Sequence, residues 1–364
     1  MAAPAVRSRG TQLGACLTLG LLAGCATVDE SASLRAPVAL NGGGGVEAAL
    51  DGRSRFREIF CRQASRGAAP SPANCDDLLW RLSDEPAPPA AGEGGETRLP
   101  VGYRIFVVTG ALGDCHFEDL VPFGQEVARL RSDGLAIEVI TVGGRSSAVH
   151  NARQIDDALR AAELRDRERV ILLGYSKGAV DILQFLVDEP ALARRVAAVV
   201  SVAGPIFGSP LADKGAWWYR HFLRNSFAGT CDPGDGGVID SLRPAERSAW
   251  MQSHPLPPDV KYFSVAAFTT EAHLGRGLKL TWEMLGGPAR RNDGQVVASD
   301  AVIPSSVLLG FVNADHWDVA LPLERQFPRL AARQVSRQFP RDVLFDALLM
   351  YVAESLPTGS ADLR

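Results

Sequence analysis

Two hydrophobic patterns alternate along the chain from about Gly102 onward. Continuous apolar runs predict strands buried on both faces, whereas apolar residues recurring every three to four positions predict amphipathic helices. Strands are expected at residues 103–110, 135–142, 169–174, 196–204, 261–269 and 305–312. Helices are expected at residues 119–132, 149–163, 178–188 and 341–355. This alternation predicts an α/β fold, in which helices flank a mostly parallel sheet.

The alternation is interrupted between residues 207 and 258. This segment combines loops and short helical stretches with large aromatic residues, among them Trp217, Trp218, Phe222, Phe227 and Trp250. An aromatic insertion over a parallel sheet is typical of a cap above a ligand crevice, so we expect a cap here. The alternative is a small satellite core whose aromatic side chains do not touch a substrate.

A shorter helical pattern precedes the alternating region. Phe56, Ile59 and Phe60 follow helical spacing, and so do three leucines between residues 78 and 82. A turn rich in Pro, Ser and Gly separates the two groups, which predicts a helical hairpin over residues 54–84. A linker rich in Pro and Gly follows at residues 85–100.

The N-terminal residues have the pattern of an export signal. Arg7 and Arg9 precede the apolar run "LGACLTLGLLAGC", which ends at Cys25 and is too short to span a bilayer. Its last four residues, Leu22-Ala23-Gly24-Cys25, resemble the lipobox of bacterial lipoproteins. That resemblance implies that Cys25 receives lipid and becomes the first residue of the mature chain. The alternative is an ordinary secretory signal that is cleaved nearby.

The residue after the lipobox bears on sorting. Ala26 stands where retention in the inner membrane would usually require Asp, so the pattern is similar to that of outer-membrane lipoproteins. The expected organisation is a lipoprotein signal peptide at 1–24, a flexible tether at 25–53, the hairpin at 54–84, a linker at 85–100, and an α/β domain at 101–356 with its cap at about 207–258.

Composition and charge narrow the possible functions. Apolar residues make up 46% of the chain and charged residues 22%, as in globular proteins with a hydrophobic core. The formal net charge is −4, so nothing indicates nucleic-acid binding. The sequence also gives no indication of a metal, a cofactor or an obligate protein partner.

Export also changes the interpretation of the six cysteines. Cys16 leaves with the signal peptide and Cys25 would carry lipid, so four cysteines remain in an oxidising compartment, namely Cys61, Cys75, Cys115 and Cys231. Four cysteines allow three pairings. We favour Cys61–Cys75, which would close the local hairpin, together with Cys115–Cys231. The alternative is four reduced and buried thiols.

A serine between two glycines occupies one strand-to-helix junction. Residues 170–173 form an apolar strand, and the apolar residues after Gly178 follow one face of a helix. Gly174-Tyr175-Ser176-Lys177-Gly178 therefore turns sharply between them and places Ser176 at the carboxyl edge of the sheet. A helix N-terminus favours developing negative charge, which suits a nucleophile at this position. The alternative is a tight turn in which Ser176 only caps the helix.

A serine nucleophile needs a base and an acid, and in this topology they follow it in the order acid, then histidine. Of the six histidines, His316 alone follows the last expected strand in a loop, which makes it the candidate base. The candidate acid is Asp293, which precedes a glycine in a turn, with Asp300 as the fallback. Asp315 and Asp318 are so close to His316 in sequence that we expect them to be solvated.

The backbone supplies the expected oxyanion hole. The N–H of Lys177 lies at the start of the helix, and the loop after the first strand of the domain offers the N–H of Ala111 or Leu112. Gly110 would allow this loop to approach the serine closely. An ordinary glycine turn is the alternative.

These motifs together resemble bacterial lipases and related α/β-hydrolases. "ILLGYSKGAVD" is similar to their serine box, "VSVAGPIFGSPLAD" to the segment after it, "NDGQVVASDAVIP" to their acid turn and "NADHWDV" to their histidine loop. The resemblance covers about residues 102–321 and implies Asp293 as acid and His316 as base. Thr109 and Lys177 depart from the usual lipase residues, which bears on substrate class rather than on the triad.

We therefore expect a serine hydrolase that cleaves carboxylic esters or lipids through Ser176, His316 and Asp293 and an acyl-enzyme intermediate. An acyltransferase or peptidase could use the same triad, and a catalytically inactive binding lipoprotein is a further alternative. The complete triad in the correct order argues against inactivity. The lipid anchor would hold the enzyme at the cell envelope, at the outer membrane or facing the periplasm.

Overall fold

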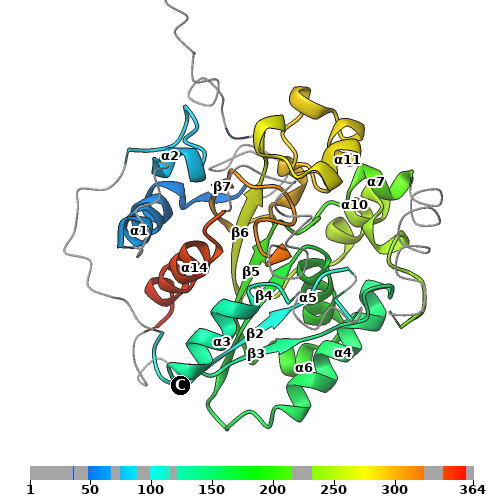
Figure 1. Cartoon of the computed structure of the whole chain (residues 1–364). Coiled ribbons are helices and arrows are strands. Elements are labelled where there is room, and N and C mark those ends of the chain that lie inside the picture. Colours follow the sequence, from blue (N-terminus) through cyan, green and yellow to red (C-terminus); the bar gives the residue numbers. More distant parts are fainter. Residues whose placement is uncertain are drawn as a thin grey trace, which may run out of the picture.

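Seven parallel strands form the centre of the molecule (Figure 1). The computed structural model of the 364-residue chain describes residues 36, 48–66, 74–87, 99–111, 113–114, 121–214, 232–323 and 339–357. The strands are β1 (Leu50–Asp51), β2 (Tyr103–Val108), β3 (Ile137–Ile140), β4 (Arg169–Tyr175), β5 (Val196–Val202), β6 (Lys261–Ala267) and β7 (Val307–Val312). They lie in the order β1-β7-β6-β5-β4-β2-β3, and every pair is parallel. The carboxyl ends of all strands therefore meet at one edge of the sheet.

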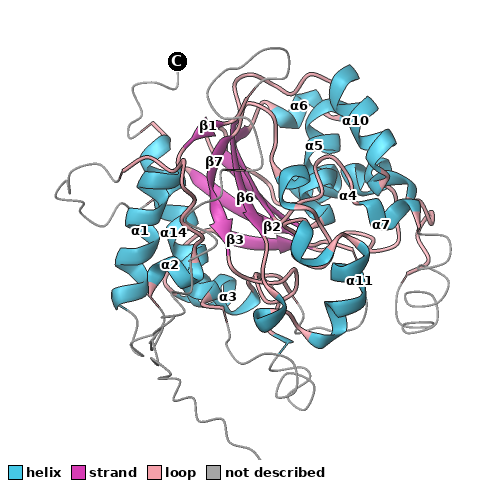
Figure 2. Cartoon of the chain, turned by 90° about the horizontal axis from the view of Figure 1, so that it is seen from above, coloured by secondary structure: helices cyan, strands magenta, loops and turns pink. Residues whose placement is uncertain are grey.

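Helices cover both faces of this sheet (Figure 2). The described α-helices are α1 (Arg53–Arg66), α2 (Cys75–Leu78), α3 (Gly124–Ser132), α4 (Ala148–Ala161), α5 (Lys177–Asp188), α6 (Pro190–Ala193), α7 (Pro210–Asp213), α10 (Pro244–Ser253), α11 (Lys279–Met284) and α14 (Arg341–Ser355). Short 3₁₀ turns occur at Asp240–Leu242, Glu271–His273, Arg276–Leu278, Gly287–Ala289 and Ala298–Ala301.

The two faces of the sheet have separate cores because successive strand residues point in opposite directions. Ile105 and Val107 of β2 join the core formed with α1, α3 and α14, whereas Phe106 and Val108 join the core formed with α4, α5 and α6. The strands are apolar throughout because both faces are covered. This three-layer arrangement agrees with the predicted α/β fold, and the helix predicted at 341–355 is α14.

The sheet begins earlier in the chain than the sequence suggested. Residues 25–53 were expected to form a flexible tether, but Leu50 and Asp51 form β1 and pair with Val307 and Leu308 of β7. Ala49 is buried beside them. A two-residue strand carries no periodic signal, so the sequence pattern does not reveal it.

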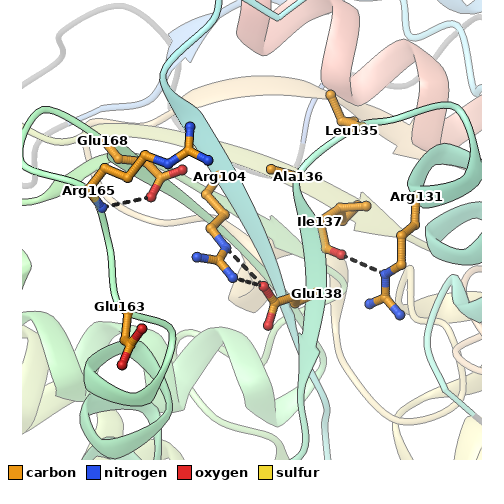
Figure 3. Close-up of a pocket in the computed structure, with 9 residues that line it drawn as sticks. All are labelled: Arg104, Arg131, Leu135, Ala136, Ile137, Glu138, Glu163, Arg165 and Glu168. Carbon is orange, nitrogen blue, oxygen red and sulfur yellow. Dashed lines mark hydrogen bonds and ion pairs between the residues drawn. The ribbon is translucent and has the colours of Figure 1, made fainter.

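A groove of about 540 Å³ lies at the opposite edge of the sheet from the strands' carboxyl ends (Figure 3). Arg104 at the start of β2 and Glu138 at the start of β3 form an ion pair in it. Arg131 donates to the carbonyl of Ile137 at 3.1 Å. The position of this groove separates it from every candidate catalytic residue.

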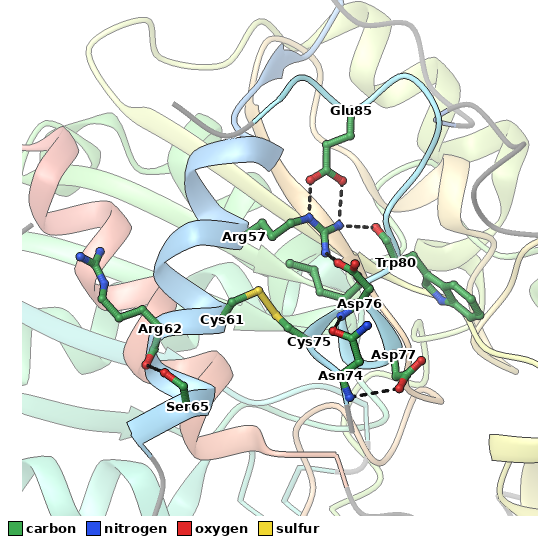
Figure 4. Close-up of a disulfide and its surroundings, with 11 residues drawn as sticks. Arg57, Cys61, Arg62, Ser65, Asn74, Cys75, Asp76, Asp77, Trp80 and Glu85 are labelled. Atoms are coloured by element: carbon green, nitrogen blue, oxygen red, sulfur yellow. Dashed lines mark hydrogen bonds and ion pairs between the residues drawn. A yellow bond between two sulfur atoms is a disulfide. The ribbon is translucent and has the colours of Figure 1, made fainter. Parts of the chain in front are cut away.

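The N-terminal hairpin packs onto the same core as α14. Phe56 and Phe60 of α1 are buried among residues of α14 and β7. The predicted Cys61–Cys75 disulfide is present and joins α1 to α2 (Figure 4). Arg57 reinforces this link, since its guanidinium donates to Asp76 at 2.8 Å and to the carbonyl of Leu79 at 2.8 Å. The hairpin thus packs into one of the two cores of the sheet rather than forming a separate unit.

After α2, the chain contacts the carboxyl end of β7. Leu79 forms an antiparallel bridge with Val312, and the backbone N–H of Trp80 donates to Phe311. The indole of Trp80 stacks on Phe268 with ring centroids 5.1 Å apart and donates to the carbonyl of Phe268 at 2.9 Å. The hairpin therefore supports the strand ends from which the acid and histidine segments begin.

The predicted cap at 207–258 is described only in part. Trp217, Trp218, Phe222, Phe227 and Cys231 lie outside the described residues, as does Cys115, so the second predicted disulfide does too. Trp250 of α10 packs against the core that contains α4 and α5. The guanidinium of Arg247 lies over its ring, with Cζ of Arg247 4.5 Å from the ring centroid of Trp250. The same ring stacks on the imidazole of His254. Trp250 is thus partly buried against the main core, and the roles expected for the other four aromatic residues stay predictions.

Candidate active site

Ser176 occupies a sharp turn between β4 and α5. Its backbone has φ 54° and ψ −131°, a conformation that residues with a side chain rarely adopt. Glycine is required at positions 174 and 178, because other backbone segments pass too close for a side chain. A Cβ on Gly174 would lie 2.5 Å from the Cα of Ala179, and one on Gly178 would lie 2.5 Å from the carbonyl oxygen of Thr109. This local geometry matches the expected nucleophile elbow.

A chain of short hydrogen bonds runs from Ser176 to a carboxylate. The Oγ of Ser176 lies 2.8 Å from Nε2 of His316, and Nδ1 of His316 lies 2.7 Å from Oδ2 of Asp293. Ser176 is 9% exposed, His316 2% and Asp293 0%. The three side chains come from segments after β4, β6 and β7, and meet at the carboxyl edge of the sheet.

The candidate acid, Asp293, is held by its own turn. Oδ1 of Asp293 accepts hydrogen bonds from the backbone N–H groups of Gln295 at 2.8 Å and Val296 at 2.7 Å, which leaves Oδ2 facing His316. Gly294 has a φ of 94°, so the turn needs glycine at this position. The fallback, Asp300, instead accepts from Ser299 and lies 3.6 Å from Arg290.

The backbone of His316 is held at both ends. Its N–H donates to the carbonyl of Asp293 at 2.8 Å, and its carbonyl accepts from the hydroxyl of Tyr175 at 2.5 Å. The rings of Tyr175 and His316 lie with centroids 5.3 Å apart. Burial, with the nearby Asp293 and Asp315, raises the pKa of the Tyr175 hydroxyl well above its usual value. Tyr175 is therefore a hydrogen-bond donor at neutral pH.

The sequence matches no protein-family model and no curated protein. Among solved structures, it is 35% identical to the metagenomic carboxyl esterase MGS0156, over 86% of this chain and 97% of that one, with a TM-score of 0.77. The chain belongs to the family of this carboxyl esterase. The parallel sheet and the similarity to this esterase confirm the predicted α/β-hydrolase fold. Membership of the esterase family confirms that the protein is an ester-hydrolysing enzyme.

Two further solved structures are less similar to this chain. The mature lipase BlEst2 of Bacillus licheniformis is 22% identical, with 62% of this chain and 89% of that one covered and a TM-score of 0.49. The phospholipase PlaB of Legionella pneumophila is 18% identical, with 55% and 45% covered and a TM-score of 0.39.

The loop after β2 of the esterase lies against the serine. A Cβ on Gly110 would lie 3.0 Å from Cβ of Ser176 and 3.1 Å from the carbonyl oxygen of Tyr175, so a side chain at this position would be crowded against the serine. Ala111, a candidate oxyanion donor, follows at the surface, and Leu112 lies outside the described residues. Lys177, the other candidate, begins α5. Thr109 fixes the start of the loop by accepting from the N–H of Val142 at 3.2 Å.

The side chain of Lys177 points into the protein rather than to solvent. Its Nζ lies 2.5 Å from Oδ1 of Asp181, and both side chains are fully buried. Oδ2 of Asp181 accepts from the amide of Asn151 at 2.8 Å, and that amide also donates to the carbonyl of Gly143 at 3.0 Å. Burial raises the pKa of Asp181, although Lys177 opposes the shift. This network joins α5 to α4 directly below the serine.

Asp315 corrects an expectation from the sequence. It was expected to be solvated, but it is only 2% exposed. Its carboxylate accepts hydrogen bonds from the backbone N–H groups of Gly275 at 2.7 Å, Trp317 at 3.0 Å and Asp318 at 2.9 Å. Burial raises the pKa of this carboxyl, and the three backbone donors oppose the shift. Asp315 therefore ties the histidine loop to the segment before α11.

Sequence reasoning also missed a polar path beside the acid. Asn313 donates from its backbone to Leu78 and from its side chain to the carbonyl of Asp77. Its side-chain oxygen accepts from the hydroxyl of Thr269 at 2.8 Å, and the N–H of Thr269 donates to Asn292, the neighbour of Asp293. These contacts link α2 to both the acid turn and the histidine loop. No motif or periodicity marks them, because they join segments far apart in the chain.

Other predicted features lie apart from the triad or outside the described residues. His254 bonds to its own helix through the carbonyl of Trp250 at 2.9 Å. His116 and His221 are not described, and neither is Cys25. Within the described ranges, no group of His, Cys, Asp and Glu could hold a metal ion. Likewise, no helix that the structure describes is both long and apolar enough to span a bilayer.

Proposed function

We propose that this protein hydrolyses carboxylic esters with Ser176 as nucleophile, His316 as general base and Asp293 as the acid that orients the base. The observation that carries this proposal is the hydrogen-bond chain of 2.8 Å and 2.7 Å through His316. Membership of a carboxyl esterase family supports the same reaction.

In the proposed acylation step, Oγ of Ser176 attacks the ester carbonyl carbon while its proton passes to Nε2 of His316. The tetrahedral intermediate carries negative charge on the former carbonyl oxygen. The N–H groups of Lys177 and Ala111 are the proposed donors to that oxygen. The C–O bond to the alcohol then breaks, and His316 returns the proton to the leaving alcohol.

In deacylation, water takes the place of the alcohol. His316 accepts a proton from the water, whose oxygen attacks the acyl-enzyme, and then returns a proton to Ser176 as the acid departs. Asp293 stays ionised through both steps, fixes the imidazole through Nδ1 and stabilises its positive charge. The bonds from Gln295 and Val296 to Oδ1 suit this role because they hold the carboxylate in one orientation.

Hydrolysis of p-nitrophenyl esters by single variants tests the proposal. Ser176→Ala should lower kcat by about 10⁴- to 10⁶-fold and abolish labelling by a fluorophosphonate probe, while the circular dichroism spectrum stays unchanged. Asp293→Asn should be nearly as inactive, and Asp300→Asn should be close to wild type because its side chain contacts Ser299 and Arg290 instead. Turnover by purified Ser176→Ala would refute the proposal.

We further propose that the enzyme is anchored by lipid on Cys25 and acts at the cell envelope, at the outer membrane or facing the periplasm. The sequence Leu22-Ala23-Gly24-Cys25 after a short apolar run supports the anchor, and Ala26 supports outer-membrane sorting. The Cys61–Cys75 disulfide supports an oxidising compartment. An enzyme held at a membrane surface would meet ester or lipid substrates there.

A further inference from the structure

The residue before the nucleophile contacts the backbone of the candidate base. Tyr175 ends β4, and its hydroxyl donates to the carbonyl of His316 at 2.5 Å. Tyr175 is 4% exposed. It belongs to the same buried apolar cluster as Ala314 and Val319, which lie on either side of His316 in the chain. The tyrosine thus joins the serine elbow to the histidine loop by a bond separate from that between Oγ and Nε2.

We infer that Tyr175 is a positioning residue of the ester hydrolase, which sets the distance between His316 and Ser176 by holding the histidine carbonyl. This inference rests on the proposed function of the triad. Because Tyr175 and Ser176 are adjacent in the chain, any shift of the elbow carries the tyrosine hydroxyl with it. The base therefore follows the nucleophile instead of moving independently.

The remaining contacts of His316 show why this bond matters. The backbone N–H and Nδ1 of His316 both bind Asp293, so these two bonds relate the histidine to the acid turn. The Tyr175 bond relates the same residue to the serine elbow. Without it, the histidine could pivot on Asp293, and a displacement of its Nε2 by about 1 Å costs on the order of 100-fold in rate.

The hydroxyl suits this role across the neutral pH range. Burial and the two nearby carboxylates raise the pKa of Tyr175, so the hydroxyl keeps its proton and stays a donor. If the Tyr175 hydroxyl were absent, the buried carbonyl of His316 would lose the hydrogen-bond donor that it has in this structure. A tyrosine at the second position of the serine box thus has a specific use in this chain.

The test compares Tyr175→Phe with Tyr262→Phe. Tyr262 lies near the start of β6, at the edge of the sheet opposite the serine, and its hydroxyl also donates to a backbone carbonyl, that of Pro257 at 3.0 Å. Each variant loses one tyrosine-to-carbonyl bond and keeps the ring. Both are assayed with a soluble p-nitrophenyl ester, and competent sites are counted by exhaustive fluorophosphonate labelling, so that rates refer to folded enzyme.

We expect Tyr175→Phe to lower kcat by about 10- to 100-fold with KM unchanged, and to slow the fluorophosphonate reaction by a similar factor. Tyr262→Phe should keep both rates. Wild-type kcat per competent site in Tyr175→Phe would overturn the inference, as would equal losses in both variants or failure of Tyr175→Phe to fold. A Ser176→Ala enzyme that retains activity would refute the proposed function instead, so the two failures are distinct.

Discussion

Both residues that flank Ser176 have buried side chains, and each has a polar partner. Tyr175 reaches the histidine loop, whereas Lys177 forms an ion pair with Asp181 one turn further along α5. A buried charge needs a partner, because an isolated charge in the interior is strongly unfavourable. The second buried cation nearby is Arg247, whose pKa burial lowers to about 10 while Asp181 opposes the shift. Asp181 therefore compensates two cations behind Ser176, the proposed nucleophile.

Removing only the ammonium should destabilise the fold. Lys177→Met leaves the buried Asp181 with Asn151 and Arg247, and we expect the free energy of unfolding to fall by about 3–5 kcal/mol in urea titrations at neutral pH. Burial already raises the pKa of Asp181, and loss of Lys177 raises it further. The folded variant then binds a proton more tightly than the unfolded chain, so the deficit should shrink as the pH falls.

A matched variant separates charge from volume. In Lys177→Met/Asp181→Asn the charge at position 181 is also absent, so part of the lost stability should return, although Arg247 then loses its compensating carboxylate, and the pH dependence from Asp181 should disappear. Equal stability of Lys177→Met and wild type at every pH would show that the ion pair does not contribute in this way.

Among the elements, α2 is four residues long and depends on its neighbours for stability. The disulfide ties Cys75 to α1, Arg57 binds the carbonyl groups after the helix, and Asn313 binds Asp77 and Leu78. Since Asn313 precedes His316 by three residues, α2 supports the loop that carries the candidate base. The short helix is thus a contact element between the N-terminal hairpin and the candidate active site.

The disulfide should contribute to stability more than to catalysis. We expect Cys61→Ser/Cys75→Ser to lose about 2–4 kcal/mol of unfolding free energy, because the open chain regains the entropy of a loop that spans 14 positions. At 25 °C kcat should change less than twofold, because Arg57 and Asn313 still hold α2. Urea titrations of wild type and variant without a reductant measure this difference, because any second disulfide then stays intact in both proteins. A variant as stable as wild type would show that the bond does not contribute to the fold.

For the molecule as a whole, the sequence predicts the features that periodicity and motif order encode. The apolar runs mark six of the seven strands, and the glycines around Ser176 mark the elbow. Chain order selects His316 as candidate base. The choice between Asp293 and Asp300 rests on the expected turn, and the structure places Asp293 against His316.

Other features could not be predicted because they depend on contacts between distant segments. β1 is too short to have a period, and Asp315 accepts a hydrogen bond from Gly275, which lies 40 positions earlier in the chain. The bond from Tyr175 to His316 spans 141 positions in the chain. Such contacts arise only once the sheet has brought its strand ends together.

The proposed anchor concerns the placement of the whole molecule in the cell. Cys25→Ser should prevent lipidation and cleavage at that site. The membrane fraction should then contain no lipid-modified form of the protein. Because Cys25 lies well before β1, kcat/KM for a soluble ester should stay within twofold of the wild-type value in detergent.

Cys16→Ser is the matched control, since it changes a cysteine upstream of the expected cleavage site and should leave anchoring intact. Fractionation into inner and outer membranes, with mass spectrometry of the N-terminal peptide, measures both effects. Wild-type protein that is wholly soluble and begins at an unmodified residue would refute the anchor, and Ser176 would then act on esters away from the membrane.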